Sequence, residues 1–175
     1  FPRPGELRLS EWTEFDLAEA TWTIPAARTK MRREHKVPLP RQGISILTAL
    51  SAITGRGKLV FPGYGMGSRA GRPVAPRPIS ENTLNGALRR MGYSPDEMTS
   101  HGFRATASTI LNESGKFSPD AIESAQSRKD RNATRSIYSR GDFWDERVRM
   151  AVWWADQLDT LRDGAKIIPI SGRTA

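Results

Sequence analysis

The residues that could do chemistry gather in a stretch that begins at Ser100 and ends at Arg140. Its opening, Ser-His-Gly-Phe-Arg, places His101 and Arg104 three positions apart at a predicted helix start, with Ser100 as the N-cap. Side chains three apart lie on one face of a helix, so the imidazole and the guanidinium can reach the same atom. Because a helix N-terminus also attracts negative charge, this arrangement predicts an anion site.

A tyrosine lies at the other end of the same stretch. Tyr138 stands among Arg131, Arg135 and Arg140, and guanidinium groups suit a phosphate. Taken singly, each residue also has an ordinary structural interpretation: a histidine that caps a helix, a tyrosine in the core, or arginines on a solvated face. The phosphate interpretation therefore depends on finding other parts of one site elsewhere in the chain.

The charge of the chain is strongly positive and unevenly distributed. Of the 175 residues, 27 are Lys or Arg and 19 are Asp or Glu, which gives a formal net charge of +8. Residues 1–140 hold 22 basic and 13 acidic residues (+9), whereas residues 141–175 hold 5 and 6 (−1). A basic body of this kind favours nucleic acid as the partner, and the dispersed arginines disfavour a membrane surface.

Several classes of site are excluded by composition. The chain has no Cys and only two His, so thiolate metal sites are ruled out and a zinc site is not expected. The absence of Cys also favours a cytosolic compartment. Gly63–Gly67 is glycine-rich, but no Gly-Lys-Ser/Thr follows it, so it is not a P-loop. No apolar run is long enough for a membrane span, and no leader peptide is expected.

Periodicity and breakers predict a mainly helical chain with one hairpin. Residues 21–39 combine a β-prone run at Thr21–Ile24 with a basic tip that carries Lys30, and Pro25 and Pro38 confine the strands to edges. A short helix is expected after Pro4, with Leu7, Leu9 and Trp12 on its buried side. Further helices are expected over residues 43–53, 81–91 (capped by Ser80), 101–112, 119–127 and 142–163, and a loop over residues 62–78.

The amphipathic helix at residues 142–163 leaves two interpretations open. An i, i+3/i+4 rhythm is kept by Trp144, Val148, Ala151, Val152, Ala155, Leu158 and Leu161. Such a helix either packs on its own domain or is exchanged with a neighbouring subunit, and we favour the first.

Four short motifs, taken in order, resemble those of the tyrosine recombinases, most closely the prophage integrases of bacterial genomic islands. Arg3–Leu7 resembles the first catalytic box, with Glu6 as its acidic residue. Thr29-Lys30 matches the family's lysine, His101–Arg104 matches the His-x-x-Arg box, and Ile137–Arg140 matches the nucleophile box. One motif alone is weak, but four in the family's order, covering Arg3 to about Asp159, are specific.

The sequence departs from the family pattern shortly before the tyrosine. The family usually shows Leu-x-His about ten residues before the nucleophile, whereas this chain has Gln126 and Arg128 at those two positions. Arg128 can donate to a phosphate oxygen but cannot act as a near-neutral imidazole. A second departure is that the catalytic domain of the family begins well before the first Arg, so we expect the chain to be a fragment without the core-binding domain.

The resemblance implies a fold, a chemistry and a set of partners. The fold would be the α+β, mainly helical DNA breaking-rejoining fold with a small antiparallel sheet, over residues 1–163, followed by a tail at 164–175. Tyr138 would attack a DNA phosphodiester to give a 3′-phosphotyrosyl link, with no metal or other cofactor. Arg3, His101, Arg104 and Arg128 would hold the phosphate, Lys30 would protonate the leaving 5′-oxygen, and Glu6 would orient its neighbours.

The implied partner is double-stranded DNA carrying an attachment site, bound by a homo-tetramer in the bacterial cytoplasm at the nucleoid, with possible accessory DNA-bending or directionality factors. The residues expected to contact DNA are Arg28, Arg32, Arg33, Lys36, Arg77, Lys129, Arg131, Arg135 and Arg140. Three alternatives stay open. They are a catalytically impaired DNA-binding integrase remnant, a type IB topoisomerase with a similar residue set, and an unrelated basic RNA-binding module.

Overall fold

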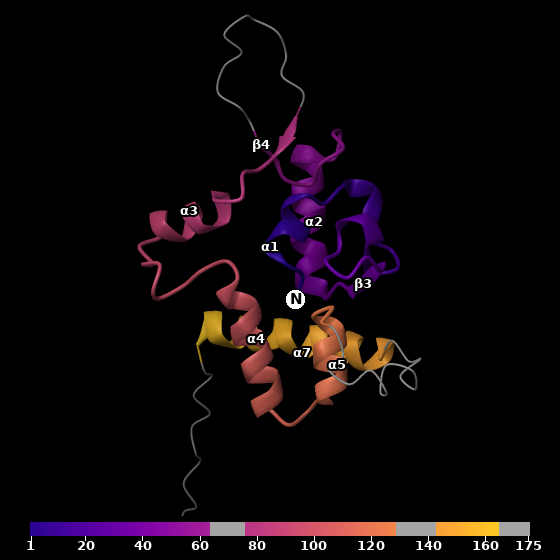
Figure 1. The fold of residues 1–175 in the computed structure, drawn as a ribbon, viewed down its shortest axis with the longest axis vertical. Helices are drawn as coiled ribbons and strands as arrows, with labels where there is room; N and C mark the ends of the chain where they lie inside the picture. Colours follow the sequence, from indigo (N-terminus) through magenta and orange to yellow (C-terminus); the bar gives the residue numbers. More distant parts are fainter. Residues whose placement is uncertain (64–75, 129–142, 165–175) are drawn as a thin grey trace, which may run out of the picture.

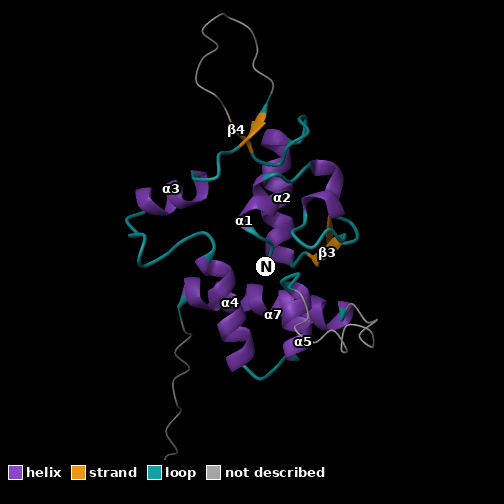
Figure 2. Ribbon diagram, viewed as in Figure 1, coloured by secondary structure: helices purple, strands orange, loops and turns teal. Residues whose placement is uncertain are grey.

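The computed structural model describes residues 1–63, 76–128 and 143–164. These residues are mainly helical with two small antiparallel sheets, in agreement with the α+β prediction (Figure 2). The helices are α1 (Pro4–Arg8), α2 (Arg41–Thr54), α3 (Thr83–Arg90), α4 (Gly102–Glu113), α5 (Pro119–Ala125) and α7 (Trp144–Asp163), with short 3-10 helices η1 (Trp12–Glu14) and η2 (Ala26–Arg28). The strands are β1 (Phe15–Asp16), β2 (Thr21–Ile24), β3 (His35–Pro38), β4 (Pro62–Gly63) and β5 (Arg77–Pro78).

The elements form two groups, with the first residue of the chain between them (Figure 1). One group contains α1, α2 and the three-stranded sheet, and the other contains α4, α5 and α7. Each group has its own cluster of buried apolar side chains. The junction between the groups is where residues from distant parts of the chain can meet.

The sheet of the first group has the order β1-β2-β3 and contains the hairpin predicted at residues 21–39. Trp22 lies opposite Val37, and Trp22, Ile24 and Val37 form a buried cluster because alternate residues of a strand share one face. The pairing of β1 with β2 was not predicted, since a strand of two residues gives no alternating pattern. Phe15 of β1 stacks on Trp22 with ring centroids 5.0 Å apart.

Helix α1 begins where proline suits a first turn, as predicted, but it buries a residue that the apolar pattern did not select. Leu7 and Leu9 are only half-buried, whereas Glu6 is 4% exposed. The reason is a capping box: the Glu6 carboxylate accepts from the Arg3 backbone N–H at 2.7 Å and from Arg3 Nη1 at 2.9 Å. Of the three residues predicted for the buried side, Leu7 packs against the cluster of the sheet, whereas Leu9 and Trp12 lie beyond the end of α1.

The second group is a helical core. Leu111 of α4, Ile122 of α5 and Met150 of α7 are almost completely buried in one cluster, together with Ala121 and Ala125. Ser118 caps α5, because its hydroxyl accepts from the Ala121 N–H at 3.3 Å. Helix α7 thus packs on its own domain, as the favoured interpretation stated, and Arg147 Nη2 also donates to the Lys36 carbonyl of β3.

Three expectations about helix faces and ends need correction. The helix predicted at residues 43–53 exists as α2, but Ile46 and Ile53 of its expected buried face are 68% and 73% exposed. Ser100 does not cap α4: its N–H donates to Asn85 Oδ1, and Thr99 Oγ1 accepts from Gly102 N–H at 3.1 Å instead. The helix predicted at residues 119–127 ends at Ala125, so that residues 126–128 form a turn.

Candidate active site

Arg104 is the most buried cation of the predicted set. It lies in the first turn of α4 and is 6% exposed. Its Nη1 donates to the backbone carbonyl of Phe1 at 2.7 Å, and its Nη2 donates to the backbone carbonyl of Gln126. The guanidinium is thus held between the start of the chain and the end of α5 by neutral carbonyls, and no carboxylate in the described part of the chain is in direct contact with it. Since a guanidinium has five N–H donors, some remain for an anion.

Arg3 reaches the same turn from the other group of elements. While Nη1 pairs with Glu6, Nη2 donates to the backbone carbonyl of Ser127 at 3.0 Å. Glu6 holds both the backbone N–H and the side chain of Arg3, which fixes the direction in which the guanidinium points. That Glu6 orients Arg3 toward a ligand stays a prediction.

The backbone carbonyls of the turn at residues 126–128 bind Arg3 and Arg104 because helix α5 ends there. The last carbonyls of a helix have no partner within it and carry partial negative charge. Ser127 adopts a positive φ of 47° at this position. Arg128 follows at the surface, where its Nη1 lies 3.0 Å from Glu123 Oε1. Folding therefore brings Arg3, Arg104 and Arg128 to one short segment.

The electrostatics of Arg104 reflect this crowding. Its pKa is lowered from the usual value to about 10, first because burial removes water from the charged group and then because Arg3 and Arg128 repel it. Glu6 and Glu123 offset only part of this effect. A bound anion would favour the charged guanidinium, so the local field is suited to a phosphate.

The described contacts do not bring His101 or Lys30 into the arginine cluster. His101 is exposed at the N-cap of α4, and its backbone carbonyl accepts from the Arg104 N–H at 3.1 Å. Lys30 is exposed on the turn between η2 and β3. That turn is held by the buried Thr29, whose Oγ1 donates to the Arg33 carbonyl at 2.7 Å. Both side chains are thus free to meet a ligand from solvent.

The predicted nucleophile lies outside the described residues. Tyr138 and the four DNA-contact candidates near it fall in the segment 129–142, and those candidates are Lys129, Arg131, Arg135 and Arg140. Their place in the site stays a prediction.

The remaining DNA-contact candidates differ in exposure. Arg32, Arg33, Lys36 and Arg77 are exposed, as a residue that contacts DNA must be. Arg28 is not: its side chain is 18% exposed, and it donates to the Leu9 carbonyl and pairs with Glu14. Arg28 therefore joins elements within the first group. Its charge is balanced by the buried Glu14 carboxylate, so it is not available to a DNA phosphate.

Sequence reasoning identified Gln126 as a departure but missed what it does. The side chain is 1% exposed, and Nε2 donates to the Arg104 backbone carbonyl at 3.2 Å. Its own backbone carbonyl accepts from Arg104 Nη2. The sequence did contain a sign of this role. A polar side chain stands where the family usually has a packing leucine, two residues before the predicted phosphate ligand Arg128.

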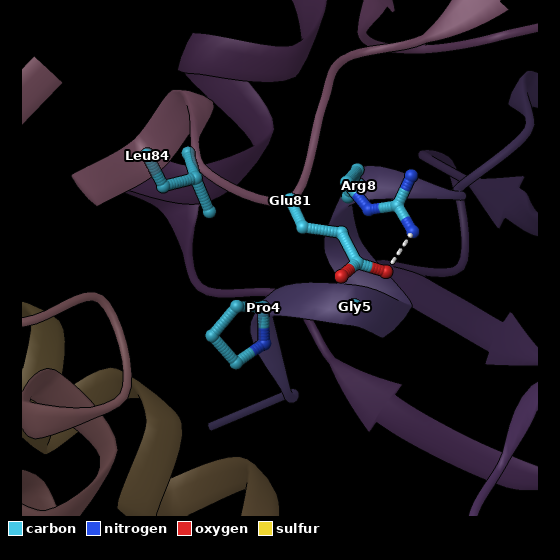
Figure 3. A pocket seen from close by; sticks show the side chains of 5 residues that line it. All are labelled: Pro4, Gly5, Arg8, Glu81 and Leu84. Atoms are coloured by element: carbon cyan, nitrogen blue, oxygen red, sulfur yellow. Dashed lines mark hydrogen bonds and ion pairs between the residues drawn. The ribbon is translucent and has the colours of Figure 1, made fainter. Parts of the chain in front are cut away.

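A small pocket lies between α1 and the segment that leads into α3 (Figure 3). Pro4, Gly5, Arg8, Glu81 and Leu84 line it, and Arg8 Nη2 pairs with Glu81 at 3.1 Å. Because its one cation is paired with a carboxylate, this pocket does not present the charge that the arginine cluster presents.

Within the described residues, no group of three His, Cys, Asp or Glu side chains is arranged to hold a metal ion. In the same part of the chain, none of the helices is long and apolar enough to cross a membrane.

Comparison with known proteins gives consistent matches. Residues 2–143 match the phage integrase family. The chain is 42% identical to an integrase of Enterobacteria phage P4 over an alignment that covers 93% of the chain and 38% of that protein. It is 37% identical to the prophage integrase IntA of Escherichia coli K12, with 95% of the chain and 38% of the relative covered. The chain thus spans about two-fifths of the length of these relatives, and no solved structure matches.

Proposed function

The chain belongs to the phage integrase family, and on that premise we propose that it carries the catalytic centre of a site-specific DNA recombinase that acts through Tyr138. The observation that carries the proposal is the convergence of Arg3 and Arg104 on consecutive carbonyls, those of Ser127 and Gln126. These two arginines come from separate motifs and separate groups of elements. Their meeting supports a common target with two oxygens to bind, such as a DNA phosphate.

In the proposed reaction, Tyr138 Oη attacks the phosphorus atom of one DNA strand in line with the 5′-oxygen. A P–O bond to tyrosine forms, the P–O bond to the 5′-oxygen breaks, and the 3′-phosphotyrosyl link conserves the bond for rejoining. Ionising a tyrosine at pH 7 costs roughly 4 kcal/mol from its reference pKa. The positive field of Arg3 and Arg104 offsets part of this cost and stabilises the charge on the non-bridging oxygens.

Proton transfer falls to the exposed groups. Lys30 would protonate the departing 5′-oxygen from its turn between η2 and β3, since an exposed ammonium can approach DNA that lies over the site. The proton lost by Tyr138 would pass to His101, whose exposed imidazole stands at the N-cap of α4 beside the Arg104 turn.

Arg128 distinguishes two versions of this function. In an active recombinase it would donate to the phosphate where the family usually has histidine. Its ion pair with Glu123 competes with that role, and this contact favours the second candidate, an integrase that binds DNA but turns over slowly.

A covalent-trapping experiment tests the proposal on the full-length protein. A nicked duplex that carries the attachment site lets the cleaved strand diffuse away, so that the phosphotyrosyl adduct accumulates. We expect an adduct with the natural protein and none with Tyr138→Phe. Equal adduct from both would refute the tyrosine mechanism. DNA binding without adduct, with cleavage restored by Arg128→His, would select the impaired version.

DNA affinity should come mainly from phosphate contacts made by exposed cations, among them Arg32, Arg33, Lys36 and Arg77. If ~6 phosphates are neutralised, affinity should fall roughly 10³-fold between about 50 and 200 mM salt. A filter-binding or anisotropy titration measures this slope, and a flat response would count against duplex DNA. Strand exchange would need four protomers on two sites in the bacterial cytoplasm, with accessory factors where the DNA must bend.

A further inference from the structure

We propose that Gln126 is a positioning residue for Arg104, an inference that rests on the proposed function of the arginine cluster. Two hydrogen bonds join the residues in opposite senses. The Gln126 side chain donates to the Arg104 backbone at 3.2 Å, and the Arg104 side chain donates to the Gln126 backbone. Each residue thus fixes the other's main chain, and the two bonds tie the first turn of α4 to the end of α5.

The reciprocal pair does something that a leucine at the same position cannot do. An apolar side chain could fill the space at the end of α5, but it offers no donor to the Arg104 carbonyl. The amide donor holds the backbone from which the guanidinium projects, while the backbone of the same residue holds the guanidinium itself. Rotation of Arg104 away from the site would break one bond, and displacement of the turn would break both.

The amide oxygen of Gln126 indicates that this side chain does more than fill space in the core. Its Oε1 is buried and has no hydrogen-bond partner among the described residues. A buried acceptor without a partner destabilises the folded state. Exchange of the amide oxygen and nitrogen would place two acceptors against each other, so the Arg104 carbonyl sets the orientation. The amide of Gln126 thus combines a destabilising buried acceptor, Oε1, with the Nε2 donor that positions Arg104.

Burial and charge explain why this guanidinium needs a separate positioning residue. Arg104 is 6% exposed and no carboxylate of residues 1–63, 76–128 or 143–164 contacts it, whereas Arg3 is oriented by Glu6. A carboxylate next to Arg104 would fix the side chain but would also neutralise the charge meant for the phosphate. Neutral carbonyls and an amide fix it without that loss.

The test replaces Gln126 by Met, which has a similar shape and no donor, and by Leu, the residue that the family pattern expects. The readouts on the full-length protein are DNA affinity, the single-turnover rate of adduct formation, and binding of inorganic phosphate by calorimetry. We expect DNA affinity within about 2-fold of the natural protein, because most phosphate contacts are elsewhere. The adduct rate and phosphate affinity should each fall about 10-fold, in line with the loss of part of one phosphate donor.

The matched control is Gln42→Met. The Gln42 amide also donates, to Asp156 at 2.9 Å and Asp159 at 2.8 Å, but these acceptors belong to α7 and neither bond involves Arg3, Arg104 or Arg128. It should change neither phosphate affinity nor adduct rate. Unchanged or faster reaction in both Gln126→Leu and Gln126→Met, with unchanged phosphate affinity, would overturn the proposal. The natural protein could also fail to form any adduct while both Gln126 variants bind phosphate more weakly than it does. That result would support the positioning role of Gln126 and would count only against the recombinase function.

Discussion

Arg28 and Arg104, two arginines with little exposure to solvent, lie in different groups of elements and serve different ends. Arg28 in the first group pairs with Glu14, whose side chain is 8% exposed, and Glu14 also accepts from Trp22 Nε1 at 3.0 Å. Arg104 in the second group is bound by the carbonyls of Phe1 and Gln126. The positive charge of Arg28 is balanced by the Glu14 carboxylate, whereas the carbonyls that bind Arg104 leave its positive charge unbalanced.

The difference identifies which cation is available for an anion. A buried charge that is paired with a carboxylate contributes to the shape of the protein and has little left to offer a ligand. A buried charge held only by neutral acceptors, with Arg3 and Arg128 nearby, is stabilised further by any anion that arrives. The predictions below test this contrast, beginning with the largest expected effect.

Replacement of each arginine by lysine should separate the two roles. Arg104→Lys retains a positive charge but cannot donate to both carbonyls and the phosphate at once, so adduct formation should fall by about 10²–10³-fold. Arg28→Lys should leave the adduct rate within about 3-fold once the folded fraction is taken into account. The covalent-trapping assay gives both rates. Equal losses would remove the distinction between the two sites.

Stability should show the reverse order. Arg28→Met leaves the Glu14 carboxylate buried and unpaired, so the free energy of unfolding should fall by about 3 kcal/mol. The double variant Arg28→Met/Glu14→Gln should recover part of that loss, because the uncompensated charge is gone. Urea denaturation of the natural protein and of both variants measures the loss and its partial recovery. A single variant as stable as the natural protein would mean that the pair contributes nothing.

Phosphate binding should depend on the ionisation of Arg104. Its pKa is lowered to about 10 by burial and by two neighbouring cations, so the group is charged at neutral pH and loses its proton as the pH rises through about 10. Affinity for inorganic phosphate should be level from about pH 7.5 to 9 and about 10-fold weaker one unit above that pKa.

The control for the pH experiment is Arg104→Met, which should bind phosphate weakly at every pH and lack the inflection near pH 10. Circular dichroism at each pH confirms that the protein is folded. An inflection of the same size in the variant would assign the titration to a group other than Arg104.

The smallest effect is expected at the rim of the cluster. Glu123→Gln releases Arg128 from its ion pair, so phosphate affinity should rise by about 2–5-fold. Stability should change by less than about 1 kcal/mol, since both side chains are 40% or more exposed. Calorimetry with phosphate and thermal unfolding report the two quantities. Weaker phosphate binding would mean that Glu123 orients Arg128 rather than competing for it.

The sequence predicted the local structure well where a pattern repeats within a few residues. The hairpin with Trp22 and Ile24 and the proline that opens α1 both follow from neighbours along the chain. The exposed face of α2 shows the limit of this reasoning, because a helical apolar rhythm does not say which other element will cover it.

The site could be predicted as a set of residues but not as an arrangement. Whether Arg28 or Arg104 keeps its charge depends on which carboxylates fold against them, and spacing in the sequence carries no such information. The burial of Glu6 and the reciprocal bonds of Gln126 likewise depend on contacts between groups that meet only in the folded chain. The order of the motifs indicated the chemistry, and tertiary contacts determined the geometry.

The positive φ of Ser127 has a consequence for how this position can vary. The group of Ser127 that accepts from Arg3 is the backbone carbonyl, so the hydroxyl takes no part in that bond. Selection should therefore act there on conformational preference: glycine, asparagine and aspartate adopt left-handed dihedrals readily, and valine or isoleucine do not. Natural variation at residue 127 should therefore follow backbone conformation, because a β-branched residue there would displace the carbonyl that accepts from Arg3.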